Sequence, residues 1–427
     1  MTPEAEREVE IATLGAGGDG IAEADGERLY VPLSVPGDRL VVRLEAARGD
    51  GRRARIVRRI ADGPARRDAP CGHFGDCGGC ALQHLSTGVY ADWKRGRVVE
   101  CLAQRGLDPG VVGPPVAAPP GDRRRLRVTA ERVGGRLVIG LNARESHRIV
   151  AIAECPVAAP PLVQVLPLLR AGLASLWPAR AKGTIALTLT ETGIDMLLAV
   201  PIRLDAPARA RLAAIADAAD LARLSVAAGE DDAPEPIAVR RTPRITFGDV
   251  AVAPPPGSFL QAGAAAEGAL VEAVRAAIPD RARIADLFAG CGTFTFPLAR
   301  HARRLVAVDR DGPAIDALDA AARAAGLGGR LAVQRRDLDR RPLAGAELAA
   351  FDVVLLDPPR AGAAAQARAL AMAAMATVVY VSCNPATFAR DARTLVDGGL
   401  ALDGVVPVDQ FLWSTHVELV AVFRRPA

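Results

Sequence analysis

The strongest candidates for catalysis in this sequence are a cysteine and a glutamate near its C-terminus. Cys383 lies in the segment Ser382–Pro385, directly after an apolar run that is typical of a buried strand. A thiolate at the end of a strand is a candidate nucleophile, although most cysteines at such positions pack in the core. Glu418, in the segment His416–Glu418, begins the last apolar run and is either a general base or a surface residue of a strand.

A thiol and a carboxylate at one edge of a sheet could together methylate C5 of a uracil ring. Uracil C5 is a poor nucleophile because the ring carbonyls withdraw its electrons. A thiolate that adds to C6 turns the ring into an enolate, and C5 can then attack an electrophilic methyl group. A carboxylate must afterwards remove the C5 proton so that the thiol can leave. In this scheme Cys383 is the nucleophile, Glu418 is the base, and Arg360 is a candidate for stabilising the thiolate.

The segments that precede these two residues predict a site for a nucleotide-containing cofactor. The segment Asp286–Phe294 follows an apolar run, and its Gly290 and Gly292 allow the backbone to turn and to approach a ligand closely. Asp309 ends the next apolar run, where a doubly wound fold places a carboxylate against ribose hydroxyls. Asp337 begins the following loop and is either an adenine contact or a helix cap.

A third segment decides which cofactor these residues favour. Asp357–Arg360 contains two prolines directly after an apolar strand, and they force the chain out at the carboxyl end of that strand, where ligands bind. A site for NAD would typically contain a third glycine after the strand, which this sequence lacks. A glycine turn, an acidic strand end and Asp-Pro-Pro in this order indicate S-adenosylmethionine.

Four cysteines are candidate ligands of a metal centre. Three of them lie in one glycine-rich loop and the fourth lies far downstream; they are Cys71, Cys77, Cys80 and Cys155. A sequence that begins without a signal-peptide pattern predicts reduced thiols, so grouped cysteines indicate metal binding rather than disulfides. Ligation by sulfur alone indicates zinc or an iron–sulfur cluster, and the spacing does not separate the two. A zinc ribbon would normally contain a second Cys-x2-Cys pair, which is absent.

The chain that positions these residues divides into three predicted domains. Residues 1–62 read as short strands separated by glycine turns, which predicts a small β-barrel. Residues 63–253 predict an α+β domain that carries the cysteine loop, and a helix at about 88–110 could pack on the catalytic domain. The proline-rich stretch Gly113–Gly121 reads as a linker. Residues 254–427 alternate strands with alanine-rich helices, which predicts a doubly wound α/β domain.

Charge and hydropathy indicate an RNA-binding protein of the cytoplasm. The net charge is only +4, but seven arginines lie between Arg43 and Arg59, and a second cluster lies within Arg123–Arg127. Arginine clusters suit phosphates, although a solvated strand face would look the same. The longest apolar stretch, Ala369–Val381, is shorter than the roughly 18 residues that a membrane span needs. We expect an RNA partner, no membrane contact and a monomer.

These motifs resemble those of the RNA 5-methyluridine methyltransferase family, and the resemblance covers most of the chain. Ser258–Gln261 is similar to the Phe-x-Gln segment that contacts the cofactor, Ser382–Pro385 to the nucleophile motif, and His416–Glu418 to the base motif. The sequence departs from the family at Thr293, where asparagine is common, and at Asp309, where glutamate is frequent. The expected contacts of the cofactor are Gln261, Phe288, Gly290, Thr293, Asp309, Asp337 and Asp357.

The resemblance is closest to the iron–sulfur 23S rRNA uracil-5-methyltransferases. It implies a structural [4Fe-4S] cluster on the four cysteines, an RNA-binding TRAM barrel at the N-terminus, and ribosomal rather than transfer RNA as the substrate. One alternative is a methyltransferase that acts on another nucleic-acid atom, such as an exocyclic amine or cytosine C5. Another is a non-catalytic RNA-binding assembly factor.

Overall fold

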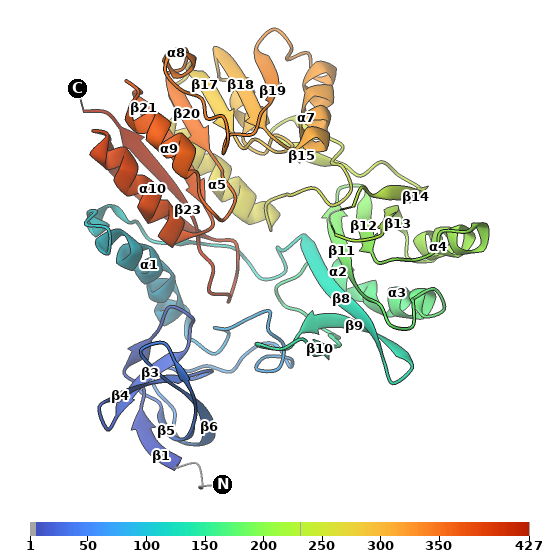
Figure 1. Cartoon of the computed structure of the whole chain (residues 1–427), viewed down its shortest axis with the longest axis vertical. Coiled ribbons are helices and arrows are strands. Elements are labelled where there is room, and N and C mark those ends of the chain that lie inside the picture. The colour runs from blue at the N-terminus through green and yellow to red at the C-terminus, as the bar shows by residue number, and fades with distance from the viewer. Residues whose placement is uncertain (1–5, 231, 427) are drawn as a thin grey trace.

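The computed structural model describes residues 6–230 and 232–426, and it contains three regions that are each built around a separate sheet (Figure 1). The N-terminal region is drawn in blue, the central region in green, and the C-terminal region in orange and red. Within the described residues, no helix has both the length and the apolar character needed to cross a membrane.

The N-terminal sheet has six strands in the order β1-β5-β6-β4-β3-β2. The strands are β1 (Glu6–Glu10), β2 (Thr13–Leu14), β3 (Gly20–Ala24), β4 (Glu27–Val31), β5 (Arg39–Arg48) and β6 (Gly51–Ala61). They surround one small core, which includes Ile11, Leu29 and Leu40. In β5, Leu40 and Val42 are buried while Arg39 is exposed and Val41 partly exposed, as the two-residue period of a strand requires. The predicted β-rich character of this region is confirmed.

The central region is a seven-stranded sheet in the order β10-β9-β8-β11-β12-β13-β14, with helices on it. Its strands are β8 (Arg125–Val133), β9 (Arg136–Asn142), β10 (Ile149–Val150), β11 (Lys182–Thr190), β12 (Gly193–Ala199), β13 (Leu221–Ala227) and β14 (Glu235–Val239). Its helices are α2 (Pro160–Gln164), α3 (Leu166–Leu173) and α4 (Ala206–Ala218). A hairpin of β15 (Ile245–Phe247) and β16 (Val250–Val252) leads to the C-terminal region.

The C-terminal sheet has eight strands in the order β19-β18-β17-β20-β21-β23-β22-β7. Seven of them follow one another in the chain: β17 (Arg283–Leu287), β18 (Arg304–Asp309), β19 (Leu331–Arg335), β20 (Val353–Leu356), β21 (Thr377–Ser382), β22 (Ala401–Asp409) and β23 (Glu418–Arg424). The helices between and beside them are α5 (Ala264–Ala277), α6 (Thr295–Ala299), α7 (Gly312–Ala324), α8 (Ala346–Ala349), α9 (Ala364–Ala371) and α10 (Pro385–Asp397). The five strands predicted from apolar runs are all present, and β17 to β21 pair in parallel.

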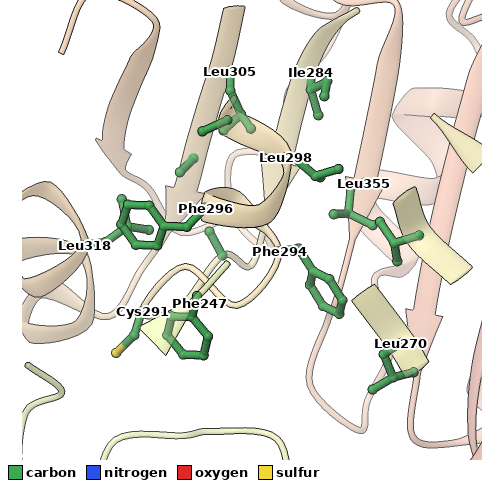
Figure 2. Packing of buried hydrophobic residues seen from close by; sticks show 14 of the residues in the cluster. Phe247, Leu270, Ile284, Cys291, Phe294, Phe296, Leu298, Leu305, Leu318 and Leu355 are labelled. Atoms are coloured by element: carbon green, nitrogen blue, oxygen red, sulfur yellow. The ribbon is translucent and has the colours of Figure 1, made fainter. Parts of the chain in front are cut away.

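Close packing against α6 and α7 explains why position 292, in the loop after β17, is a glycine. Gly292 has φ of 100°, and a Cβ atom there would lie 2.6 Å from the ring of Phe296. Figure 2 shows Phe296 beside Leu318 of α7, and both side chains are buried. The backbone of the loop therefore passes too close to the core for any side chain at position 292.

The segment between the N-terminal and central regions belongs partly to the C-terminal region, which corrects the expectation that Gly113–Gly121 is only a linker. Helix α1 (Thr87–Ala103) contacts α10, and its buried Leu102 joins the same apolar core as β20 and β21. Strand β7 (Val116–Ala117), inside the proline-rich stretch Gly113–Gly121, pairs in parallel with the edge strand β22. Prolines tolerate such an edge position because few of its N–H groups enter the ladder.

A buried ion pair joins α1 to the end of β22. Lys94 is fully buried, and its Nζ lies 2.6 Å from Oδ1 of Asp409. The Tyr90 hydroxyl donates to Oδ2 of Asp409 at 2.5 Å, while Lys94 donates to the carbonyl oxygens of Phe411 and His416. Burial lowers the pKa of Lys94, and Asp409 opposes that shift. The pair thus fixes both ends of the loop between β22 and β23.

Replacing Lys94 by methionine tests how much this pair stabilises the fold. The variant leaves the Asp409 carboxylate buried without its cation, and we expect a loss of about 3–5 kcal/mol in the free energy of unfolding. Urea unfolding followed by tryptophan fluorescence measures the change. Lys182→Met is the matched control because Lys182 is exposed. Equal unfolding midpoints for the two variants would contradict the stabilising role.

Candidate active site

The predicted site residues gather at the carboxyl edge of the C-terminal sheet. The strand order reverses between β17 and β20, and ligands of open α/β sheets bind at such a point. A cavity of about 440 Å³ opens there. Seven of the nine residues predicted for catalysis or cofactor binding line it: Gln261, Phe288, Gly290, Asp309, Asp357, Cys383 and Glu418.

The antiparallel strand β23 places the predicted base beside the predicted nucleophile. Ser382, the last residue of β21, pairs with Leu419 near the start of β23. Because β23 runs opposite to β21, its first residue, Glu418, lies at the edge where β21 ends and Cys383 follows. Glu418 is 2% exposed, so it is not the surface residue that the sequence left open.

The turn after β17 is held in place by the carboxylate that ends β18. Phe288 and Gly290 both have positive φ, at 64° and 53°. The N–H of Gly290 donates to Oδ2 of Asp309 at 2.8 Å, and the N–H of Asp311 donates to Oδ1 at 2.9 Å. Each carboxylate oxygen retains a second lone pair for a ligand in the cavity. Asp309 can therefore fix the turn and contact a ligand at the same time.

Two glutamine amides connect the carboxyl group of Asp357 with that of Glu418. Gln261 Nε2 donates to Oδ2 of Asp357 at 3.0 Å. Gln410 Nε2 donates to Oε1 of Gln261 at 2.9 Å and to Oε2 of Glu418 at 2.5 Å. Gln410 is buried and directly follows β22. Sequence reasoning missed it because a single glutamine after a strand carries no recognisable pattern.

Burial and neighbouring carboxylates raise the pKa of both Asp357 and Glu418. Burial raises the pKa of Asp357 to about 7, and Asp286 and Asp309 add to the shift, while the Gln261 amide opposes it. Burial also raises the pKa of Glu418 well above its usual value; Asp357 adds to this, and the Gln410 amide lowers it. The ligand-free cavity therefore favours protonated carboxyl groups, and a cation bound there would favour the ionised forms.

The same surroundings make Cys383 a weak acid. Burial raises the pKa of its thiol to about 11; Glu418 and Asp357 raise it further, and Arg360 lowers it. Arg360 lies at the cavity, as the sequence predicts, but its effect is outweighed. In the ligand-free chain the thiolate is consequently rare at neutral pH.

Two predicted cofactor contacts lie elsewhere. Thr293 lines a separate cavity of about 570 Å³, together with Arg124 and Glu267. Asp337 accepts hydrogen bonds from the N–H groups of Asp339 and Arg340, so its carboxylate caps the loop that it begins. Asp339 lines the main cavity where Asp337 was expected. That Thr293 and Asp337 contact a cofactor remains a prediction.

An exposed aromatic side chain stands at the mouth of the cavity. Phe259 lines the cavity and is 65% exposed, which is unusual for phenylalanine. The guanidinium of Arg125 lies 5.0 Å from the centre of its ring. Phe411 lines the same cavity from the loop between β22 and β23. These rings were not singled out from the sequence, although Phe259 lies in the segment Ser258–Gln261.

The four predicted metal ligands line one further cavity, of about 290 Å³: Cys71, Cys77, Cys80 and Cys155. Within residues 6–230 and 232–426, no three side chains of His, Cys, Asp or Glu are grouped closely enough to hold a metal ion. Phe411 and His416, from the loop between β22 and β23, also line this cavity. The thiols thus surround a space rather than a point.

The arginine clusters are largely paired with carboxylates. Arg124 is buried and bonded to Glu267, so its guanidinium is unavailable to RNA, which corrects the expectation for that residue. Arg127 lies 2.5 Å from Glu230, and Arg43 of the N-terminal sheet lies 2.7 Å from Glu6. The four side chains of these last two pairs are solvent-accessible, and such pairs contribute little energy, so phosphates can compete for the two arginines.

The raised pKa of Cys383 predicts slow alkylation. A pKa of about 11 instead of 9.0 leaves a thiolate fraction about 100-fold smaller at neutral pH. We expect iodoacetamide to label Cys383 of the ligand-free protein about tenfold faster per pH unit, without a plateau up to pH ~10. Site-resolved mass spectrometry measures the rate, and the guanidinium-unfolded chain is the control. A plateau below pH ~9 would show that the thiol is not shielded.

Comparisons with known proteins agree with this geometry. A family profile described as tRNA (uracil-5-)-methyltransferase matches residues 248–425. An uncharacterised RNA methyltransferase of Caulobacter vibrioides is 45% identical over an alignment of 428 positions, which covers 98% of this chain and 100% of that protein. The 23S rRNA (uracil(1939)-C(5))-methyltransferase of Pseudomonas putida is 36% identical over 97% of this chain and 93% of that protein.

A solved structure shares the whole architecture. The tRNA (uracil-54, C5)-methyltransferase of Pyrococcus abyssi, crystallised with S-adenosyl-L-homocysteine, matches with a TM-score of 0.76 at 24% identity, over 98% of this chain and 100% of that one. It shows that the two proteins have the same fold, including the Rossmann-like methyltransferase region. Together with the full-length relatives, it shows that this chain is an S-adenosylmethionine-dependent RNA methyltransferase of the RNA 5-methyluridine methyltransferase family.

Proposed function

We propose that this protein transfers a methyl group from S-adenosylmethionine to C5 of a uridine in RNA through a covalent adduct of Cys383 with C6. The observation that carries the proposal is the meeting of Cys383 and Glu418 in one cavity, beside the residues predicted for cofactor binding. Methylation at C5 requires a nucleophile for C6 and a base for the C5 proton within the span of one ring. The Pseudomonas putida relative supports 23S rRNA as the target.

The charge of the cavity suits this cofactor. Its wall carries five carboxyl side chains and two guanidinium groups: Asp309, Asp311, Asp339, Asp357, Glu418, Arg310 and Arg360. A mainly acidic wall favours a ligand with a sulfonium and an ammonium group over one with a pyrophosphate. Asp309 is placed to hold ribose hydroxyls. When bound, S-adenosylmethionine supplies the electrophilic methyl group.

The chain's own residues account for the remaining chemistry. The thiol proton of Cys383 passes to solvent, and Sγ bonds to C6 of the uracil, which moves the C5–C6 π electrons onto the ring carbonyl as an enolate. C5 then bonds to the methyl carbon while the bond from that carbon to the sulfonium sulfur breaks, which leaves a neutral thioether. Glu418 removes the remaining C5 proton, the C5–C6 double bond forms again, and the C6–S bond breaks to release the thiolate. Because Glu418 is buried, water has little access to the enolate and cannot compete with the methyl group for C5.

Two substitutions separate the roles of nucleophile and base. Cys383→Ala should form no adduct with RNA and show no turnover, because C5 is never activated. Glu418→Gln should methylate the ring but release it about 100-fold or more slowly, so the adduct accumulates. Labelled 23S rRNA and tRNA transcripts, analysed on denaturing gels and by nucleoside mass spectrometry, measure both effects.

The control for this experiment is Cys101→Ala, which removes a neighbouring buried thiol: Cys101 shares a smaller cavity with Cys383 but does not line the active-site cavity. It should retain adduct formation and turnover. Turnover in Cys383→Ala would favour methylation of another atom, such as an exocyclic amine. Methylation of the tRNA transcript alone would overturn the assignment to ribosomal RNA.

We also propose that the four cysteines hold a [4Fe-4S] cluster. The supporting observation is that all four cysteines line one cavity of about 290 Å³, and ligation by sulfur alone suits such a cluster. A cluster there would join the loop of Cys71–Cys80 to Cys155 of the central region. Its role is structural, because the reaction above transfers no electrons.

Replacing Cys155, which lies far from the other three cysteines in the sequence, tests the cluster. Cys155→Ser should lower the iron and acid-labile sulfide of anaerobically purified protein from about four per chain and should remove the broad visible absorption of the cluster. Elemental analysis and absorption spectra measure the loss, and Cys101→Ala is again the control. Stoichiometric zinc without sulfide in the unsubstituted protein would contradict the proposal.

A further inference from the structure

Gln410 is a buried polar residue whose contacts all lead to the proposed site. It is 4% exposed and follows the last residue of β22. Its side-chain oxygen accepts a hydrogen bond from the N–H of Ala262 at 2.9 Å. Its side-chain nitrogen contacts Glu418 and Gln261. A buried amide with every group satisfied has one fixed orientation.

The backbone N–H of Ala262 decides that orientation. An N–H group can only donate, so the atom of Gln410 that faces it must be the oxygen Oε1. The two N–H groups of Nε2 then point to Oε2 of Glu418 and Oε1 of Gln261. With its oxygen engaged in this way, Gln261 must turn its own Nε2 toward Asp357.

One backbone group therefore sets the direction of every hydrogen bond in this network. Both carboxyl groups, Glu418 and Asp357, receive an N–H donor and neither faces an acceptor. A carboxylate that accepts hydrogen bonds is stabilised in its ionised form. A protonated carboxyl can still accept the same hydrogen bond through its carbonyl oxygen, but it accepts more weakly than a carboxylate does, so the donor favours the ionised form.

The residue before Gln410 is held independently. Asp409 is bound by the buried Lys94 and by the hydroxyl of Tyr90, both on α1. The backbone of Gln410 is consequently anchored from the opposite side of the sheet edge. The amide thus has little freedom to follow Glu418 when the carboxyl group moves, so it holds the carboxyl group in place.

We infer that Gln410 is a positioning residue for proton abstraction: its N–H donor favours the ionised form of Glu418 and holds that side chain toward the cavity, and it aligns Gln261 with Asp357. The inference rests on the proposed role of Glu418 as the base. Gln410 does not touch the reacting atoms in this arrangement. Its loss should therefore slow release of the product more than formation of the adduct.

The pH dependence of release distinguishes this role from general packing. The donor from Gln410 lowers the pKa of Glu418. Removing the donor should raise that pKa, and the base acts only when it is ionised. The acid limb of the release step must therefore move to higher pH, while a loss of packing alone would lower the rate equally at every pH.

Gln410→Met tests the inference because methionine has a similar length and cannot donate a hydrogen bond. Single-turnover release of tritium from RNA containing [5-³H]uridine is measured between pH ~6 and ~9, with adduct formation followed on denaturing gels. We expect the acid limb to shift upward by about one pH unit, which makes release about tenfold slower at the low end. Adduct formation should change less than about threefold.

Val408→Ala is the matched control, since it shortens a buried apolar side chain of the same strand. It should leave the acid limb unmoved. If Gln410→Met does not fold, Gln410→Asn carries the test, because its shorter amide should move the acid limb in the same direction. The inference is overturned if the folded variant shows no shift in the acid limb of tritium release. It is also overturned if the variant forms less adduct but releases tritium at an unchanged rate.

The same assay distinguishes this inference from the proposed function. Absence of an adduct between the unsubstituted protein and 5-fluorouridine RNA would overturn the covalent mechanism itself. An adduct in the unsubstituted protein, combined with an unshifted profile in Gln410→Met, would overturn only the role of Gln410.

Discussion

The electrostatics of the active site depend on two carboxyl groups, Asp357 and Glu418, that face one cavity. Burial raises the pKa of both; Asp286 and Asp309 add to the shift of Asp357, and Asp357 adds to the shift of Glu418. Like charges at short range in a medium of low dielectric cannot all ionise without compensation. In the described residues, two glutamine amides donate to these carboxyl groups and lower their pKa values. A positively charged ligand is therefore what this cavity binds best.

The nearby carboxyl groups also explain why Cys383 is a poor nucleophile while the cavity holds no ligand. The carboxyl groups of Glu418 and Asp357 add to the effect of burial in raising the pKa of Cys383. A cation in the cavity would lower the pKa of all three groups at once, which makes formation of the thiolate and of the base depend on the same event. A cysteine that is protonated in the ligand-free state also resists oxidation and alkylation.

The three regions of the chain meet at the loop between β22 and β23. The carbonyl oxygen of Trp413 accepts hydrogen bonds from the N–H groups of Ala81 and Leu82, at 2.8 and 3.0 Å, directly after Cys80. Lys94 of α1 binds the same loop from inside. Phe411 of this loop lines both the cavity with the cysteines and the active-site cavity. The loop is consequently shaped by contacts from residues more than 300 positions earlier in the chain.

The sequence by itself determined the α/β order of the C-terminal region and the residues at its edge. Buried parallel strands are continuous apolar runs, and residues that directly follow them must share one edge, so Cys383 and Asp357 could be placed together without coordinates. Only the tertiary structure decided what lies between elements far apart in sequence. It placed β7 at the sheet edge, buried Arg124 against Glu267, put Asp339 in the cavity and inserted Gln410 between Glu418 and Gln261. The reason is physical: strand periodicity is a local property of the chain, whereas the partner of a buried polar group depends on which distant segment packs against it.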